Sequence, residues 1–152
     1  MKLRHANQTA RCLVGRAEGF SLEAYPDSGG IWTIGWGTTR IHGKPVTEGL
    51  TITKEQAVEY FNHDMFEVEA QVTSLVKVPL TNNQFSALVS LVYNIGSGQF
   101  QKSTLLRKLN QGDYDGAANE FERWVFDNGV KLDGLVTRRE RERELFITPD
   151  DE

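Results

Sequence analysis

The sequence predicts an α+β fold in which a small antiparallel β lobe and a larger helical lobe are joined by a long helix. Three observations support this prediction. Short β-prone runs, broken by turn residues, are confined to about residues 20–52. A capping-box sequence then opens one long helical pattern over about 54–76. Apolar residues at helical spacing fill about 80–147, which we expect to form the helical lobe together with an N-terminal helix.

Length and composition indicate a single globular domain over residues 1–152. The chain is 39% apolar and 25% charged, which is ordinary for globular proteins. A net charge of −4 gives no general attraction to nucleic acid. The single cysteine, Cys12, excludes an internal disulfide, and we expect it to pack as a small apolar residue. The apolar run Cys12-Leu13-Val14 is too short for a signal peptide or a membrane span, so we expect neither export nor stable membrane insertion.

The first helix is expected over Thr9 to Gly19, with Glu18 as its last residue and with Cys12, Leu13 and Val14 as candidates for its inward face. In the β lobe, the turn residues of 26–30 and 42–45 predict two hairpins. The helical lobe is expected to hold four helices. The first runs from the capping box Thr81-Asn82-Asn83-Gln84 to Ile95, and the second from after Ser103 to near Gly112. The third runs from Asp115 through Val125, and the fourth from about Thr137 to Phe146.

Two carboxylates, Glu18 and Asp27, lie nine positions apart on a helix end and a hairpin, from which both can project into one space. Glycoside hydrolysis needs such a pair: a protonated acid for the leaving oxygen, and a carboxylate that holds a water or attacks directly. The negative pole at the C-terminal end of a helix disfavours a charged carboxylate, so Glu18 is the better candidate for the acid. Asp27 lies among turn amides, which favour its ionised form.

The role of Thr33 depends on the register of the first hairpin. A two-residue turn, Gly29-Gly30, would pair Asp27 with Trp32 and direct Thr33 to the other face. A three-residue loop, Gly29-Gly30-Ile31, would pair Asp27 with Thr33. We predict the longer loop or an equivalent bulge.

The spacing of Glu18, Asp27 and Thr33, the last within Thr33-Ile34-Gly35-Trp36-Gly37, resembles the catalytic signature of phage lysozymes, the muramidases or endolysins of glycoside hydrolase family 24. The resemblance is to the T-even phage lysozyme type, and it is strongest to the endolysins of lambdoid phages. It covers most of the chain, through the segments 85–88, 93–96, 103–110 and 134–142.

The resemblance implies a lysozyme-like fold with an active-site cleft between the lobes. It implies hydrolysis of the β-1,4 bond between N-acetylmuramic acid and N-acetylglucosamine in bacterial peptidoglycan, without metal or organic cofactor. Glu18 would protonate the glycosidic oxygen, while Asp27 and Thr33 would hold a water on the opposite sugar face and so invert the anomeric carbon. Arg138 would lie near Glu18 and fix its carboxyl group. The further sugar contacts implied are Thr39, Tyr93, Asn94 and Ser103.

One position departs from this pattern: Thr38 stands where many relatives have histidine, so no structural histidine pair is expected. His5, His42 and His63 have no metal-ligand spacing. The charged run of residues 138–144 is interpreted as a solvated helix face.

The partners implied are peptidoglycan glycan strands and no nucleic acid, with the protein acting as a monomer. We expect synthesis in the host cytoplasm and action on the periplasmic cell wall after a separate holin-like protein permeabilises the membrane. Two alternatives remain at this stage. One is a lytic transglycosylase, which uses one acid and no water, and the other is a cell-wall-binding module without catalysis.

Overall fold

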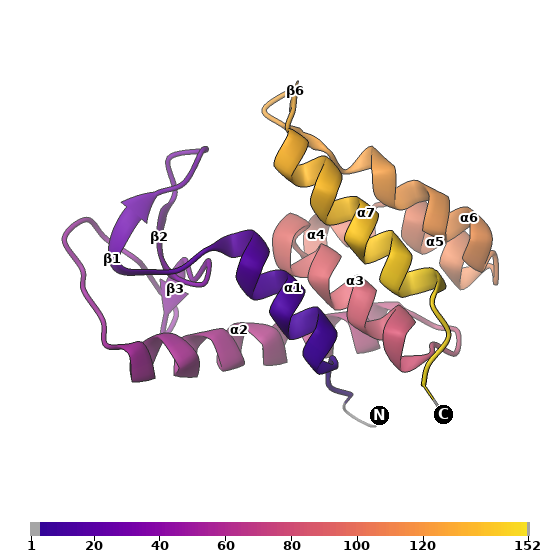
Figure 1. Cartoon of the computed structure of the whole chain (residues 1–152), viewed down its shortest axis with the longest axis horizontal. Helices are drawn as coiled ribbons and strands as arrows, with labels where there is room; N and C mark the ends of the chain where they lie inside the picture. Colours follow the sequence, from indigo (N-terminus) through magenta and orange to yellow (C-terminus); the bar gives the residue numbers. More distant parts are fainter. Residues whose placement is uncertain (1–3, 152) are drawn as a thin grey trace.

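The computed structural model describes residues 4–151, which form seven α-helices, one 3-10 helix and six short strands. Figure 1 shows the strands β1, β2 and β3 gathered on one side, the helices α3 to α7 on the other, and α2 running beneath both. This arrangement confirms the α+β class. The N-terminal helix α1 lies against the helical side, where it contacts α3 and α7.

The β lobe consists of two short hairpins, as predicted. β1 (Ser21–Pro26) pairs antiparallel with β2 (Trp32–Gly35), and β3 (Arg40–Ile41) pairs with β4 (Lys44–Pro45). Its own core is small, consisting of Ala24, Ile34 and Val46 with a few half-buried neighbours. The lobe therefore depends on α2, which contacts β2, for support.

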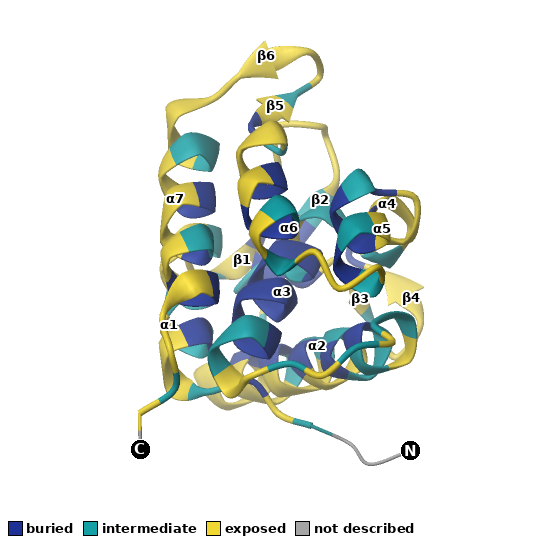
Figure 2. Cartoon of the chain, turned by 90° about the vertical axis from the view of Figure 1, so that its right-hand side faces the viewer, coloured by how far each residue is buried: buried dark blue, intermediate teal, exposed yellow. Residues whose placement is uncertain are grey.

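Both predicted capping boxes open helices. Thr53 caps α2 (Lys54–Leu75) and Thr81 caps α3 (Asn82–Ile95), each with the reciprocal glutamine bond three residues on. Every residue from Phe85 to Val92 in α3 is buried, and Figure 2 shows this helix at the centre of the helical lobe. The centre of the main core is thus one apolar helix, as its sequence predicts.

The remaining elements complete the helical lobe, in which α1, α4 and α7 contact α3 directly. They are α1 (Gln8–Glu18), α4 (Ser97–Gln101), α5 (Thr104–Asn110), α6 (Tyr114–Glu120), the 3-10 helix η1 (Phe121–Arg123), the strands β5 (Phe126–Asp127) and β6 (Val130–Lys131), and α7 (Asp133–Ile147). The prediction that Ser103 caps α5 is confirmed, because its hydroxyl accepts from Leu106 N. The short helix α4 was not predicted.

The prediction of one helix from Asp115 through Val125 is wrong. Asp113 caps α6, which ends at Glu120, and the chain then forms the hairpin β5–β6. The cause is the pair Asn128 and Gly129, both of which have positive φ, as a tight hairpin turn requires. The final helix also begins earlier than predicted, at Asp133 rather than Thr137.

The expected packing of Cys12 is also wrong, because this side chain is exposed. α1 buries Ala10 and Val14, which lie one turn apart on the same face, whereas Leu13 is only half-buried. Cys12 lies two residues from each, on the opposite side of the helix. Within residues 4–151, no helix combines the length and the apolar character needed to cross a membrane.

Candidate active site

Glu18 is the last residue of α1, and its carboxyl group is held from two sides. Gly19 ends the helix with φ 73°, and its N–H donates to Gly15 O. Arg138 Nη1 of α7 lies 2.7 Å from Glu18 Oε1. Gly37 packs against the same group so closely that a Cβ there would lie 2.8 Å from Glu18 Oε2. The Glu18 side chain remains 19% exposed, which keeps it accessible to a substrate.

Arg138 is itself fixed by two partners besides Glu18. Its Nε donates to Glu142 Oε2 at 3.2 Å, and its Nη2 donates to Ser90 O at 3.0 Å. Glu142 is fully buried and also accepts from Ser90 Oγ at 2.6 Å and from Arg139 Nη1 at 2.5 Å. Glu18 is therefore attached to a buried network rather than to one flexible arginine.

The other end of this network reaches Asn94, at the end of α3. Arg139 Nη2 donates to Asn94 Oδ1, and Arg139 Nε donates to Trp124 O at 2.8 Å. Burial lowers the pKa of Arg139, while the charge and hydrogen bond of Glu142 act in the opposite direction. Glu142 thus offsets part of the cost of burying the charged guanidinium group of Arg139.

These contacts correct the interpretation of residues 138–144 as a solvated face. Arg138, Arg139 and Glu142 are buried, whereas Glu140, Arg141 and Glu144 are exposed. Alternating charge in the sequence cannot distinguish the two sets, because the buried side is set by which helices pack against α7. The signal that could have separated them is spacing, since residues 138, 142 and 145 follow one helical face.

Asp27 is held by its own loop. Its Oδ1 accepts from Gly29 N at 2.8 Å and from Ile31 N at 2.9 Å, while the side chain stays exposed. These backbone donors fix the orientation of the carboxyl group. The loop tip also touches the helical lobe, because Ser28 Oγ donates to Asp127 Oδ2 on β5.

The predicted register of this hairpin is wrong. The loop has three residues but begins one residue earlier than predicted, so Asp27 lies opposite Ile31 and Thr33 pairs with Tyr25. The bonds to Asp27 Oδ1 and the positive φ of Gly30, 83°, favour this closure. Because side chains alternate along a strand, Asp27 and Thr33 still share one face of the hairpin, diagonally rather than directly opposed. Thr33 is 4% exposed, and its Oγ1 donates to Ile31 O.

Tyr25 and Gly37 are the two neighbours of the carboxylates that the sequence reasoning missed. Burial raises the pKa of the Tyr25 hydroxyl, and the charges of Glu18 and Asp27 raise it further. Both carboxylates therefore lie within electrostatic reach of one tyrosine. The two-residue spacing from Tyr25 to Asp27, which puts them on the same strand face, was the signal available for Tyr25.

The four expected sugar contacts differ in their surroundings. Thr39 and Asn94 are exposed. Tyr93 donates its hydroxyl to Trp36 O at 2.7 Å, and burial raises its pKa. Ser103 is 8% exposed, and its hydroxyl donates to Phe100 O and accepts from Leu106 N at the start of α5. The hydroxyl groups of Tyr93 and Ser103 thus make hydrogen bonds within the protein.

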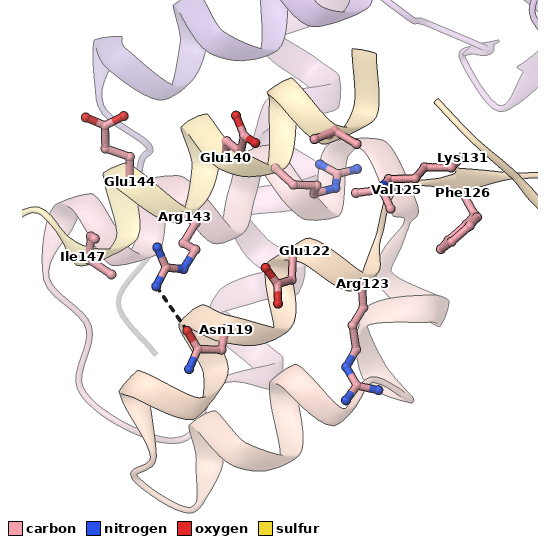
Figure 3. Close-up of a pocket in the computed structure, with 12 residues that line it drawn as sticks. Asn119, Glu122, Arg123, Val125, Phe126, Lys131, Glu140, Arg143, Glu144 and Ile147 are labelled. Atoms are coloured by element: carbon pink, nitrogen blue, oxygen red, sulfur yellow. Dashed lines mark hydrogen bonds between the residues drawn. The ribbon is translucent and has the colours of Figure 1, made fainter. Parts of the chain in front are cut away.

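A hollow of about 690 Å³ lies between α1 and the start of α7, and its lining includes Glu18, Asn94 and Arg138. A larger groove of about 930 Å³ lies on the other side of α7, where Arg143 donates to Asn119 (Figure 3). That groove contains neither Glu18 nor Asp27, so its size alone does not mark the reactive site. Among residues 4–151, no three His, Cys, Asp or Glu side chains are grouped to hold a metal ion.

Thr38, the position that departs from the family pattern, donates its hydroxyl to Asp64 Oδ2 of α2 at 2.7 Å. Burial raises the pKa of Asp64, and this hydrogen bond partly opposes the rise. The contact joins the end of the first hairpin to the linking helix.

Comparison with known proteins supports the same assignment over nearly the whole chain. Residues 15–142 match the family described as phage lysozyme. The endolysin of Salmonella phage P22 is 47% identical over 134 residues, which cover 88% of this chain and 91% of that protein. The endolysin of Acyrthosiphon pisum secondary endosymbiont phage 1 is 42% identical over 146 residues, covering 93% and 97%.

Among solved structures, the endolysin from Escherichia coli O157:H7 phage FAHEc1 superposes with a TM-score of 0.84 at 39% identity. The match covers 99% of this chain and 98% of that one. Because the family match, the sequence relatives and the shared fold agree over most of its length, the chain belongs to the phage lysozyme family.

Proposed function

We propose that this protein is an endolysin that hydrolyses the β-1,4 bond between N-acetylmuramic acid and N-acetylglucosamine in bacterial peptidoglycan and thereby lyses the host cell. The observation that carries the proposal is the arrangement of two carboxylates from different elements, Glu18 and Asp27, around Tyr25. One is held by a buried arginine and the other by backbone amides. Membership of the phage lysozyme family supplies the substrate class.

In the proposed mechanism, Glu18 donates a proton to the glycosidic oxygen as that bond breaks. The guanidinium of Arg138 fixes the orientation of this carboxyl group at the end of α1. A mobile carboxyl group would lose rate because general acid catalysis requires hydrogen-bond contact with the leaving oxygen.

Asp27 and Thr33 hold the attacking water in this proposal. The loop amides occupy Asp27 Oδ1, so Oδ2 accepts from the water. The Thr33 hydroxyl donates its proton to Ile31 O, so it meets the water as an acceptor. Attack from the face opposite Glu18 inverts the anomeric carbon, and no metal or organic cofactor takes part.

The finer assignments belong to the same proposal. We place the chain in the T-even phage lysozyme type of glycoside hydrolase family 24, closest to the lambdoid phage endolysins, and infer one monomeric domain. Thr39 and Asn94 are the proposed sugar contacts, since both are exposed. Synthesis in the host cytoplasm, with access to the periplasmic wall through a holin-like permeabiliser, completes the proposal.

Product analysis tests the chemistry. Purified peptidoglycan is digested with the wild type and with Glu18→Gln, and the fragments are identified by mass spectrometry. We expect reducing-end muramic acid from the wild type and at least about 1,000-fold slower release from the variant, because the general acid is lost. Fragments with 1,6-anhydro ends would instead identify a lytic transglycosylase, and wall binding without fragments a binding module.

The access route has a separate test. Expression of the chain alone should leave intact cells unlysed, whereas co-expression of a membrane permeabiliser should cause lysis that depends on Glu18. Prompt lysis without the permeabiliser would contradict this part of the proposal alone.

A further inference from the structure

We infer that Glu142 and Arg139 are positioning residues for the proposed reaction. Glu142 holds Arg138 in contact with Glu18, and Arg139 holds Asn94, which lines the same hollow as Glu18. The inference rests on the proposed hydrolysis at Glu18. Neither residue lines that hollow with Glu18. They act through the residues that do.

The first step is the orientation of Arg138. A guanidinium is planar, so two fixed contacts define where its third edge points. Glu142 Oε2 holds Nε and Ser90 O holds Nη2, which directs Nη1 at Glu18 Oε1. Arg138 and Glu142 are 5% and 0% exposed, so water cannot replace either contact.

The second step is charge. The buried cluster holds two guanidinium groups, Arg138 and Arg139, and one carboxylate, Glu142. Glu142 offsets one positive charge, so the cluster presents one net positive charge to Glu18 rather than two. This matters because each added positive charge nearby favours the ionised form of Glu18, which cannot act as an acid.

The third step is Asn94. Because Arg139 Nη2 donates to Asn94 Oδ1, the amide oxygen is committed to the protein and the NH₂ group is left as the donor on an exposed side chain. A sugar hydroxyl or acetamide carbonyl can accept from it. The one ion pair between Arg139 and Glu142 therefore orients the acid at one end and a donor to the substrate at the other.

The central test is Glu142→Gln, which keeps the shape of the side chain and removes its charge. On soluble peptidoglycan fragments we expect kcat to fall at least about 10-fold with KM changed less than about threefold, because the acid is misplaced more than binding is weakened. The alkaline limb of the rate profile, where a general acid loses its proton, should move to lower pH. The charged and titratable groups near Glu18 include Asp133, Arg138, Arg139 and Arg141 from α7, Arg16 from α1, Tyr93 from α3 and Tyr25 from β1, and this variant leaves all of them in place.

The matched control is Glu120→Gln. Glu120 is also a buried carboxylate of the helical lobe with two cationic partners, but these are Lys108 and Arg123 rather than the groups around Glu18. We expect this variant to lose stability without the loss of kcat or the shift of the alkaline limb. Equal kcat and equal pH profiles for the two variants would overturn the inference while the wild-type activity upheld the proposed function.

Two further measurements keep the test decisive. If Glu142→Gln does not fold, the double variant Arg139→Met/Glu142→Leu removes both charges of the pair and replaces them with apolar packing, which buried ion pairs often tolerate. A wild-type kcat in that variant would refute the positioning role. If the wild type releases no products, a ¹³C-detected titration of Glu18 still tests whether Glu142 acts on this carboxyl group. Its midpoint should be lower in Glu142→Gln than in the wild type and unchanged in Glu120→Gln; equal midpoints in all three proteins would overturn the inference independently of the proposed reaction.

Discussion

Glu18 and Asp27 are held in place by different kinds of contact. Glu18 depends on Arg138, which lies 120 positions away in the chain and is itself held by buried side chains. Asp27 depends on backbone N–H groups two and four positions away. One carboxylate is positioned by tertiary packing and the other by its own turn. The two sides of the site should therefore respond differently to mutation.

Removing the tertiary support should cause the largest loss of stability. Arg138→Met leaves Glu142 with only one cation and Glu18 with none. A buried ion pair that loses one partner costs about 3–5 kcal/mol, so the free energy of unfolding in urea should fall by that amount. The control is Arg143→Met on the same helix, whose hydrogen bond to Asn119 lies at the exposed surface (Figure 3). An equal fall in the free energy of unfolding in both variants would show that the buried network stabilises the protein no more than a surface hydrogen bond does.

Crowding the Glu18 carboxyl group should have the next largest effect. Gly37→Ala places a Cβ 2.8 Å from Glu18 Oε2 at a residue with φ 85°. We expect stability to fall by about 1–2 kcal/mol and kcat to fall about 100-fold, because the acid must move. Gly43→Ala is the matched control: its φ is 78°, but no atom lies within 4 Å of the added Cβ. Both should show backbone strain, and only Gly37→Ala should lose activity.

A third carboxylate, Asp64, lies between the two cases, because it is half-buried and accepts one side-chain bond from Thr38. Burial raises its pKa in the folded state. The stability that the protonated form contributes is present below the unfolded pKa and is lost as the pH rises through the folded pKa. Urea unfolding from pH 3.5 to 7 should show this loss in the wild type and not in Asp64→Asn, with a difference below about 1 kcal/mol after solvent screening. Parallel curves for the two proteins would contradict the prediction.

The local support of Asp27 should give the smallest change in stability. Asp27→Asn keeps a side-chain oxygen for Gly29 N and Ile31 N, so the loop is retained and the unfolding free energy should stay within about 0.5 kcal/mol of wild type. Activity should nevertheless fall about 100-fold or more, because the amide cannot take a proton from the attacking water. Loss of stability without loss of activity would contradict the view that Asp27 serves the reaction rather than the stability of the fold.

Much of the fold could be predicted from sequence because its signals are local. The boxes at Thr53 and Thr81 and the cap at Ser103 each act within three residues. The two hairpins of the β lobe were likewise predicted from their turn residues. The Asn128-Gly129 turn is an equally local signal, but the apolar pattern through Phe121 and Val125 favours a helix and so obscures it.

The site was less predictable because its supports are not local. The spacing of Glu18, Asp27 and Thr33 identified the candidate residues, but the register that pairs Thr33 with Tyr25 depends on bonds to the Asp27 side chain. The burial of Arg138, Arg139 and Glu142 could not be read from a run of alternating charges. Whether a charged residue faces solvent depends on what packs against its helix.

By itself, the sequence determined the α+β class, the main helix starts, the first two hairpins and membership of a lysozyme family, since each is encoded by residues a few positions apart or by a fixed motif. Only the tertiary structure decided how Glu18 is held. Its supports come from helices that are distant in the chain: Arg138 of α7 lies 120 positions from Glu18, and Ser90 of α3 and Glu142 of α7 hold Arg138 in turn. Charged groups of this kind become a defined network only when packing removes water and leaves each of them no other partner.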